Sequence, residues 1–328
     1  MPNYEYDDWR SEVMRELDEQ GVSVLLNVLS AADSDIFRCQ LHQWYKDLDV
    51  QGRKPCSKVG LAAHYRVGHL EASWNVRLKV KDVFAQVWGT RKLLSSFDAV
   101  SVCEPPELGY TEFYDPSFHW LHIDQSAERR GLHAYQGSVT LEDIAEDDWP
   151  FLVMPGSHVF HEEFYQTFPE AVEGSNHLTY HDLTDAQVDW YKKKGCELIR
   201  KPVPKGGMIL WDSRTVHANA RPKRGRKHHD RWRYVVFVCM TPAIWASDTD
   251  IADKKRAFNE LKMTGHWPSQ KIKVFDELDY SGIRVITDLP TVAKTDEVRR
   301  LAGDLGYDFS NDEPNGPSWR PKWGGDKN

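Results

Sequence analysis

The sequence contains no long apolar run. None of its apolar stretches approaches the roughly 18 residues that a membrane-spanning helix requires, so we expect no membrane segment. The first eight residues are acidic and lack the basic start and apolar stretch of a signal peptide. Together these absences predict a cytoplasmic protein with no membrane partner.

Cysteine is scarce and scattered. The five cysteines are Cys39, Cys56, Cys103, Cys196 and Cys239, and no two of them form a Cys-x-x-Cys pair. An odd, dispersed set does not fit the disulfide framework of small secreted domains, and it lacks the spacing of a zinc finger. We therefore expect reduced thiols.

The chain also lacks a surplus of positive charge. It carries 42 Lys and Arg against 50 Asp and Glu, a formal net charge of −8. A protein that coats nucleic acid needs excess basic side chains, so nucleic acid is not an expected partner. Aromatic residues, by contrast, are plentiful: the chain has 13 Trp, 13 Tyr and 13 Phe, which suits a β-rich core.

The distribution of apolar residues predicts a single domain over 1–328 with three segments. Residues 1–95 are expected to be mostly helical, 96–240 to form a strand-rich core, and 241–328 to form a helix and an irregular tail. Many short strands without regular alternation with helices favour a sandwich or barrel over a doubly wound parallel sheet. The predicted fold class is therefore mainly β with flanking helices.

The individual elements are expected from helical spacing or from short apolar runs bounded by Gly and Pro. Helices are expected over 5–20, 34–49, 71–88, 159–168, 184–194 and 249–263. Strands are expected over 22–28, 97–103, 118–123, 133–141, 151–154, 197–203, 208–211, 214–218 and 232–240.

One group of residues has the pattern of a metal site. His122 and Asp124 stand two residues apart at a predicted strand, so their side chains share one face. His217 lies in another strand-like segment, 93 residues after Asp124, and can supply a third ligand. Two histidines and one carboxylate form the ligand set of non-haem Fe(II) oxygenases. The alternative is that His122 is simply a buried, hydrogen-bonded histidine.

Three other histidine–carboxylate pairs have the same local spacing. They are His69 with Glu71, His161 with Glu163, and His228 with Asp230. The first two fall at predicted helices, where residues i and i+2 diverge, and the third falls in a very basic loop. We expect all three to be surface pairs.

An iron centre of this kind leaves positions for a bidentate 2-oxo acid, whose far carboxylate must also be held. Arginine suits that role because its planar fork binds a carboxylate through two hydrogen bonds. Arg231 and Arg233 stand at the start of the apolar strand over 232–240 and share one face by the period of two. The pattern does not choose between them.

Four motifs follow one another along the strand-rich segment. They are His119-Trp-Leu-His-Ile-Asp-Gln125, Phe151-Leu-Val-Met-Pro-Gly-Ser-His158, Lys205-Gly-Gly-Met-Ile-Leu-Trp-Asp-Ser-Arg-Thr-Val-His217 and Arg233-Tyr-Val-Val-Phe-Val. In this order and spacing the chain resembles the phytanoyl-CoA dioxygenase-like family of Fe(II)/2-oxoglutarate oxygenases. The resemblance covers residues 118–240, and segments 74–98 and 240–268 look like one branch of the same family.

The resemblance implies a double-stranded β-helix, a jelly-roll or cupin-like barrel with helices packed outside. It implies Fe(II) bound by His122, Asp124 and His217, with 2-oxoglutarate and O2 as co-substrates and succinate and CO2 as products. Related halogenases lack the carboxylate ligand, so a retained Asp124 implies hydroxylation, desaturation or ring formation and argues against halogenation.

Aligning the apolar strand with the family points to Arg233 as the 2-oxoglutarate ligand. The separation of 16 residues between His217 and Arg233 is longer than in better-known members, so Arg231 and Arg226 stay open as alternatives. Gln136 is a candidate for a second 2-oxoglutarate contact.

Residues 221–233 hold seven Lys or Arg and one acid. This basic loop is either a solvated segment or a mouth that attracts anionic substrates such as phosphates, CoA esters or carboxylates. We expect a small organic molecule as substrate, anionic under the second interpretation. Two other functions stay open: a cupin-like metalloprotein without 2-oxoglutarate chemistry, and a non-catalytic binding module.

Overall fold

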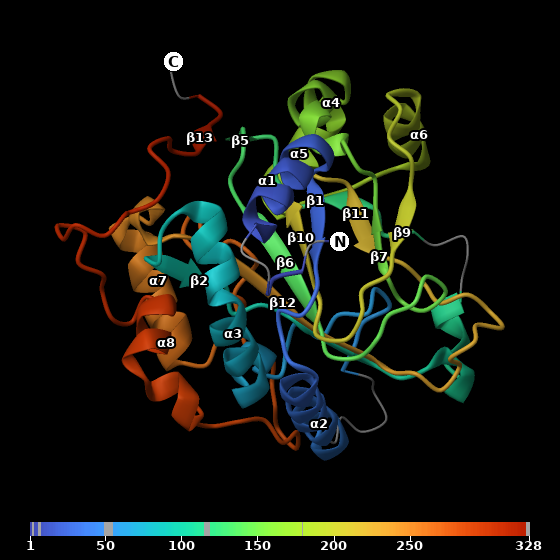
Figure 1. Ribbon diagram of the computed structural model, residues 1–328, viewed down its shortest axis with the longest axis horizontal. Helices are drawn as coiled ribbons and strands as arrows, with labels where there is room; N and C mark the ends of the chain where they lie inside the picture. Colours follow the sequence, from blue (N-terminus) through green and yellow to red (C-terminus); the bar gives the residue numbers. More distant parts are fainter. Residues whose placement is uncertain (2, 6–7, 49–54, 115–118, 179, 326–328) are drawn as a thin grey trace.

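Two antiparallel sheets lie at the centre of the molecule, with helices outside them (Figure 1). The structure is a computed structural model that describes residues 1–325 except 2, 6–7, 49–54, 115–118 and 179. The helices are α1 (Trp9–Gln20), α2 (Ala31–Asp47), α3 (Glu71–Trp88), α4 (His161–Thr167), α5 (Pro169–Leu178), α6 (Asp185–Lys193), α7 (Asp248–Asn259) and α8 (Asp296–Leu301).

The strands form two main sheets and a small ribbon. They are β1 (Val22–Leu25), β2 (Leu93–Ser95), β3 (Val100–Cys103), β4 (His122–Ile123), β5 (Arg129–Arg130), β6 (Tyr135–Thr140), β7 (Phe151–Val153), β8 (His181–Asp182), β9 (Ile199–Lys201), β10 (Met208–Asp212), β11 (His217–Asn219), β12 (Arg233–Pro242) and β13 (Lys322–Trp323). The six-stranded sheet has the order β1-β10-β6-β12-β2, with β3 also paired to β12. The five-stranded sheet has the order β8-β4-β11-β7-β9, and β13 pairs with β5.

Alternation along β10 shows how the six-stranded sheet is placed. Met208 and Leu210 belong to the large apolar core that includes residues of α1, α2 and α3. Ile209 and Trp211 point to the opposite face and pack with Phe151 of the other sheet. Because successive side chains of a strand alternate between faces, one face of this sheet is covered by helices and the other faces the five-stranded sheet.

The five-stranded sheet alternates in the same way. Ile123 of β4 and Ala218 of β11 pack in a second core with Phe164 and Tyr191, which come from α4 and α6. Their neighbours His122 and His217 therefore face the space between the two sheets. This alternation positions the candidate site.

The helix ends follow local sequence signals. The Ser30 side chain accepts a hydrogen bond from the backbone N–H of Asp33 at the start of α2. Thr184 and Gln187 form a capping box at the start of α6. Helix α3 ends where Gly89 adopts a φ of 66°, a left-handed conformation that favours glycine.

The predicted class, mainly β with flanking helices, is confirmed by the antiparallel sheets and the helices around them. Helices α1, α2, α3, α4, α6 and α7 all fall within or next to the predicted ranges. The strand expected over 22–28 is β1, and β2, which was not expected, also belongs to the six-stranded sheet. The strand expected over 118–123 reduces to β4, and Phe118 lies outside the described residues.

Helices α5 and α8 were not predicted. The first begins at Pro169 and contains Gly174, residues that usually mark a loop, although proline is well tolerated in the first turn of a helix. The second has only 6 residues, too few for a periodic pattern to stand out.

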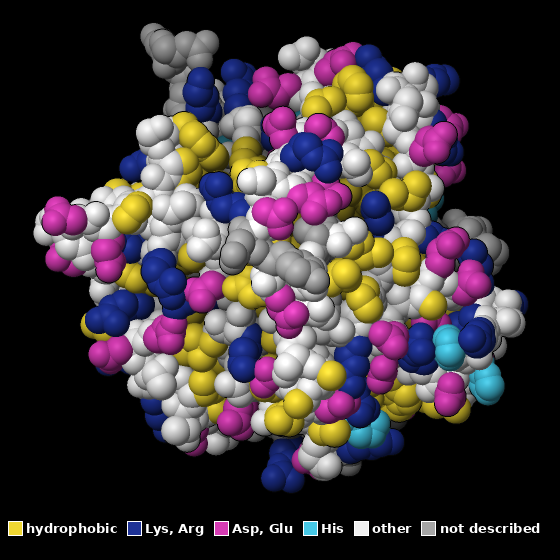
Figure 2. Space-filling model, in the orientation of Figure 1, with side chains coloured by type: hydrophobic (Ala, Val, Ile, Leu, Met, Phe, Trp, Pro, Cys, Tyr) yellow, Lys and Arg dark blue, Asp and Glu magenta, His cyan; other side chains and the backbone are white. Residues whose placement is uncertain are grey.

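The outer surface is of mixed character on the face drawn in Figure 2, where basic, acidic and apolar side chains are interspersed. Within the described part of the chain, no helix combines the length and the apolar character needed to cross a bilayer.

Candidate metal centre and its cavity

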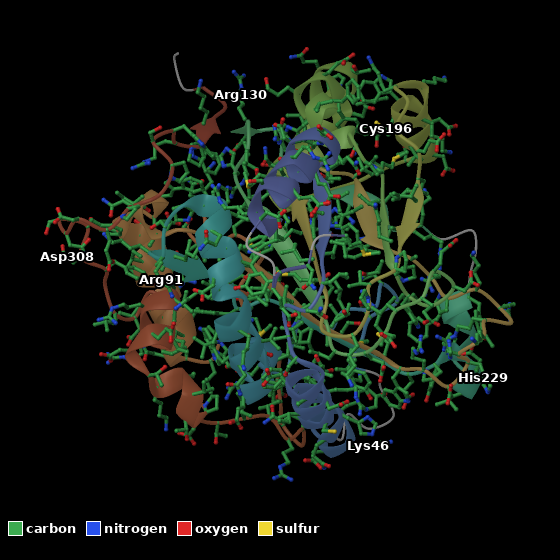
Figure 3. The ribbon with its side chains drawn as sticks, viewed as in Figure 1. Lys46, Arg91, Arg130, Cys196, His229 and Asp308 are labelled. Atoms are coloured by element: carbon green, nitrogen blue, oxygen red, sulfur yellow. The ribbon has the colours of Figure 1, made fainter. Side chains whose placement is uncertain are left out.

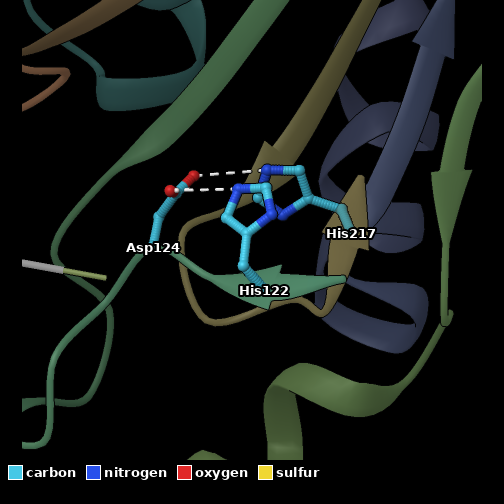
Figure 4. Close-up of side chains that lie close together, drawn as sticks. All are labelled: His122, Asp124 and His217. Atoms are coloured by element: carbon cyan, nitrogen blue, oxygen red, sulfur yellow. Dashed lines mark ion pairs between the residues drawn. The ribbon is translucent and has the colours of Figure 1, made fainter. Parts of the chain in front are cut away.

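His122 and His217 lie side by side because their strands are paired. Strands β4 and β11 run antiparallel, and His122 is directly opposite His217 in the register. Asp124 follows β4 immediately and turns its carboxylate toward both rings (Figure 4). The structure therefore brings together the three side chains singled out by spacing.

The geometry of the three groups fits a single ion. Their candidate ligand atoms all lie within 4.8 Å of one another. The distance from His122 Nε2 to Asp124 Oδ1 is 3.4 Å, and that from His217 Nε2 to Asp124 Oδ2 is 3.3 Å. All three residues are buried.

Backbone carbonyls orient both imidazoles. His122 Nδ1 lies 2.7 Å from the Trp120 carbonyl oxygen, and His217 Nδ1 lies 3.0 Å from that of Thr215. When Nδ1 donates its proton to a carbonyl, Nε2 carries the free lone pair that a metal ion needs. The rings are also held by stacking, His122 on Trp120 and His217 on Phe151.

The electrostatics of the site favour the metal-binding protonation states of His217 and Asp124, whereas His122 is held toward its protonated form by the Asp124 carboxylate and must lose that proton to bind a metal. Burial lowers the pKa of His217, and the His122 imidazole lowers it further. Burial alone would lower the pKa of His122, but the Asp124 carboxylate raises it above its ordinary value. Burial raises the pKa of Asp124, yet the imidazoles of His266, His217 and His122 hold it well below the usual range. Asp124 is therefore an anion, the form in which a carboxylate binds metal.

A cavity of about 230 Å³ opens between the sheets beside the three residues. Aromatic residues supply much of its wall, namely Trp120, Phe151, Tyr180, Trp211, Phe237 and Phe275. Polar side chains also line it, namely Asp98, Gln136, Asn219, His266 and Lys273. A second, more open hollow of about 660 Å³ lies between α2 and residues 284–290, and none of the three candidate ligands lines it.

Arg233 lies behind the cavity wall. Its side chain is buried, Nη1 donates to Ser101 Oγ at 2.7 Å, and Nη2 donates to Asn219 Oδ1 at 2.7 Å. Burial lowers the pKa of this guanidinium. Among the described residues, Arg233 has no carboxylate within ion-pair distance, and its Nε has no hydrogen-bond partner. It is a buried cation beside two cavity-lining residues, Asn219 and Phe237.

The other arginines proposed for 2-oxoglutarate are already paired. Arg231 Nη1 lies 3.1 Å from Asp148 Oδ2. Arg226 is buried and bridges Glu107 at 2.9 Å and Asp148 at 2.8 Å. Neither arginine lines the cavity. The exposed part of the basic loop lies at the side where Figure 3 labels His229, and none of the residues 221–233 lines the cavity.

Gln136 lines the cavity but contacts a candidate ligand. Its Nε2 donates a hydrogen bond to Asp124 Oδ2 at 2.8 Å. The side chain therefore orients the carboxylate, and the 2-oxoglutarate contact expected from the sequence stays a prediction.

Two of the competing histidine pairs are not surface pairs, and that expectation was wrong. His69 is buried, with Nε2 at 2.8 Å from the Lys262 carbonyl oxygen. His161 is buried, with Nε2 at 2.9 Å from the Gln125 carbonyl oxygen. Both are core histidines because packing from distant segments covers them, which helical spacing does not reveal. His228 and Asp230 do lie at the surface.

The sequence analysis missed the residues that close the cavity on its other side. His266, Lys273 and Phe275 come from residues 263–275, here called the 263–275 arm. The arm folds back on itself, since Gly265 N–H donates to the Lys273 carbonyl at 2.8 Å and Phe275 N–H to that of Met263 at 2.9 Å. Asp98 reaches the same end of the cavity from the segment before β3. Only the resemblance over 74–98 and 240–268 hinted at these segments.

Comparison with known proteins identifies relatives at low identity. No family model matches the chain. Ava biosynthesis cluster protein O of Aspergillus versicolor is 25% identical over 286 residues, covering 81% of this chain and 88% of that protein. SnoK, the non-heme alpha ketoglutarate dependent carbocyclase from nogalamycin biosynthesis, has a TM-score of 0.50 and 18% identity over 71% of this chain and 83% of its own. EctD from S. alaskensis, solved with bound Fe, has a TM-score of 0.48 and 15% identity over 69% of this chain and 74% of its own. The chain thus shares the fold of SnoK.

Proposed function

We propose that this protein is an Fe(II)/2-oxoglutarate-dependent oxygenase of the phytanoyl-CoA dioxygenase-like type. The observation that carries the proposal is the pair His122 and His217, opposed in register with both Nε2 atoms turned to the Asp124 carboxylate. Two imidazoles and one carboxylate are the donor set of non-haem iron oxygenases. The facing sheets and the fold shared with SnoK support a double-stranded β-helix as the scaffold.

Arg233 is the proposed ligand of the far carboxylate of 2-oxoglutarate. A buried guanidinium without an acidic partner costs free energy unless an anion binds to it. Arg233 meets this description, whereas Arg231 and Arg226 have their charges balanced by Asp148 and Glu107. Asn219 accepts a hydrogen bond from Arg233 and stands two residues after His217 in β11. The Arg233 guanidinium therefore lies close to the strand that carries a candidate metal ligand.

The rest of the site holds and shields the reacting groups. When bound, Fe(II) and 2-oxoglutarate supply O2 activation and substrate oxidation, with release of succinate and CO2. Trp120 and Phe151 fix the ligand rings by stacking, and Trp211 packs near His217. These aromatic walls exclude water from the oxidising centre. With Asp124 present as a ligand, we propose hydroxylation or a related oxidation and not halogenation.

The proposed substrate is a small organic molecule. The cavity of about 230 Å³ supports this size class, as does the name of the Aspergillus versicolor relative, which places that protein in a biosynthesis cluster. An anionic group on the substrate would meet Lys273 at the cavity rim, since the basic loop does not contribute to the lining.

An anaerobic titration with Fe(II) and then 2-oxoglutarate tests the proposal. We expect a weak visible charge-transfer band from the chelated 2-oxo acid, abolished in Asp124→Ala. In Arg233→Met, loss of a charge-assisted hydrogen bond should raise the Kd for 2-oxoglutarate by about 10- to 100-fold. Arg231→Met is the matched control and should keep the wild-type Kd.

Other outcomes would reassign the function. Iron binding without the band would favour a cupin-like metalloprotein, and no iron binding would favour a non-catalytic binding module. A weakened band in Arg231→Met but not in Arg233→Met would move the 2-oxoglutarate site to Arg231.

A further inference from the structure

Asp98 is a carboxylate in the cavity that the fold leaves without a counter-ion. Its Oδ1 accepts a hydrogen bond from the adjacent Ala99 N–H at 2.7 Å. Among the described residues, no Lys, Arg or His nitrogen lies within 4.0 Å of its oxygens. The residue lines the cavity and retains part of its exposed surface there. The second oxygen is therefore available to a hydrogen-bond donor bound in the cavity.

The surroundings of Asp98 make its charge costly unless a partner binds. Burial raises the pKa of Asp98, and His266, the Ala99 N–H and Arg77 offset only part of that rise. Arg77 lies in the buried layer behind it, where Nη1 donates to the Gly68 carbonyl, while Nε and Nη2 have no partner among the described residues. A charged group enclosed by protein is costly unless it is hydrogen-bonded, so the free oxygen of Asp98 is a strong acceptor for a ligand.

Asp98 and the Arg233 guanidinium lie at separate points along the cavity. Strand β3 runs antiparallel to β12, and Phe237 N–H donates to the Ala99 carbonyl. Arg233 Nη1 donates to Ser101 Oγ, and Ser101 follows Asp98 by three positions, about 10 Å of extended chain at 3.3 Å per residue. The cavity thus has a guanidinium behind its wall at one point and a carboxylate in its lining at another, with the candidate metal ligands lining it as well.

Apolar and aromatic side chains supply much of the wall around Asp98. Leu61, Ala63 and Phe275 line the cavity with it, and the 263–275 arm adds the polar side chains of His266 and Lys273. Trp120 and Tyr180 complete the wall beside the metal ligands. Such a lining favours a flat apolar body, and a single buried acceptor selects the orientation in which that body binds.

We propose that Asp98 is the specificity-determining anchor of the substrate, and that the substrate is a flat, apolar small molecule carrying an N–H donor, either a lactam or amide N–H or a protonated amine. The donor binds the free oxygen of Asp98, and this contact directs the rest of the molecule toward His122, Asp124 and His217. The inference rests on the oxygenase function proposed above and names its substrate class.

The alternative is that Asp98 only closes its own turn through the Ala99 N–H. Asp98→Asn keeps that acceptor and removes the charge, whereas Asp98→Ala removes both. Asp308→Asn is a matched control, because Asp308 makes the same kind of local contact to the Ser310 N–H and lies far from the cavity at the edge of the molecule (Figure 3).

The test measures binding of four probes by calorimetry to the full chain loaded with Mn(II) and 2-oxoglutarate. The probes are carbostyril and its N-methyl derivative, and naphthylmethylamine and the corresponding methyl ether. In wild type and Asp308→Asn we expect the N–H member of each pair to bind about 10-fold tighter or more, as befits a hydrogen bond to a charged acceptor. Asp98→Asn should abolish the preference for the amine and retain much of that for the lactam, and Asp98→Ala should abolish both.

Equal affinity within each pair in wild type, or a preference that survives in Asp98→Ala, would overturn the anchor. So would a loaded protein that binds none of the four probes. These failures are separate from failure of the oxygenase function, which is read from the Fe(II) and 2-oxoglutarate titration without any substrate.

Discussion

Gln136 determines how the Asp124 carboxylate faces the two imidazoles. The hydrogen bond of 2.8 Å from Gln136 Nε2 engages Asp124 Oδ2, the oxygen nearest His217. A ligating carboxylate that loses such support rotates, and loss of an outer-shell partner typically costs 10- to 100-fold in metal affinity. At the scale of the single residue, this one hydrogen bond sets the orientation of the carboxylate in the candidate metal centre.

We therefore expect Gln136→Leu to raise the Kd for Fe(II) by about 10- to 100-fold. An anaerobic competition titration with a chelator measures that Kd, and the absorption spectrum of the Co(II) form reports the ligand geometry independently. Gln43→Leu is the control, because Gln43 pairs with Asp47 on the outer side of α2. Wild-type affinity and an unchanged Co(II) spectrum in Gln136→Leu would refute this role.

At the scale of elements, the 263–275 arm is held by the C-terminal ribbon. Strand β13 pairs with β5, which carries Arg129. The Arg129 guanidinium lies between two indoles, 3.7 Å from the ring centroid of Trp267 and 4.5 Å from that of Trp323. Trp267 follows His266, so the tail braces the part of the arm that lines the cavity. Cation–π contacts of this kind contribute about 1 to 2 kcal/mol when partly desolvated.

Removing the outer indole should loosen the arm without unfolding the protein. In Trp323→Ala we expect faster hydrogen exchange at Gly265 and Phe275, whose N–H groups close the arm, and a loss of about 1 to 2 kcal/mol of stability. Mass spectrometry after timed exchange measures the first effect. Trp319→Ala, in the same tail but packed on Trp88 and Trp245, should leave arm exchange unchanged. Equal protection of the arm in both variants would show that the ribbon does not brace it.

At the scale of the whole molecule, buried histidines make stability depend on pH. Burial lowers the pKa of His69 to about 3, that of His133 to about 3 and that of His161 to about 4. An unfolded histidine takes up a proton below about pH 6.5, while these three stay neutral in the fold. The unfolded state thus binds more protons between about pH 6.5 and pH 3 to 4, and stability falls as the pH falls through that window.

We expect the free energy of unfolding to be lower at pH 5 than at pH 7.5, by about 2 kcal/mol for each such histidine. Urea unfolding at the two pH values measures the difference. His69→Phe keeps an aromatic ring next to Phe97 and removes the titration, so it should reduce the pH effect by about one histidine's share. His229→Gln, in the exposed loop, is the control. Identical unfolding free energies at both pH values would contradict this account.

Local periodicity was enough to locate the strands that carry His122 and His217. His122 and Asp124 stand two apart, and the expectation that their side chains share a face holds although β4 ends at Ile123, one residue before Asp124. The apolar run after Arg233 predicted a strand over 232–240, and β12 begins at Arg233 and ends at Pro242. Short apolar runs bounded by Gly and Pro likewise predicted β7, β10 and β11, although their ends shifted by one to three residues.

Contacts between segments that are far apart in the sequence could not be predicted from the sequence and were found only in the structure. Arg226 and Arg231 form ion pairs with Asp148, which lies about 80 residues earlier, so their charges are already balanced and neither needs 2-oxoglutarate as a partner. Asp98 and His266 stand 168 residues apart and still line one cavity. Burial, ion pairing and cavity shape depend on which segments pack together, and in a sheet of crossing strands that partner choice is not a local property of the chain. The candidate metal ligands could therefore be predicted from spacing, whereas the proposed anchor for the substrate emerged only from the packing of the 263–275 arm and the segment before β3.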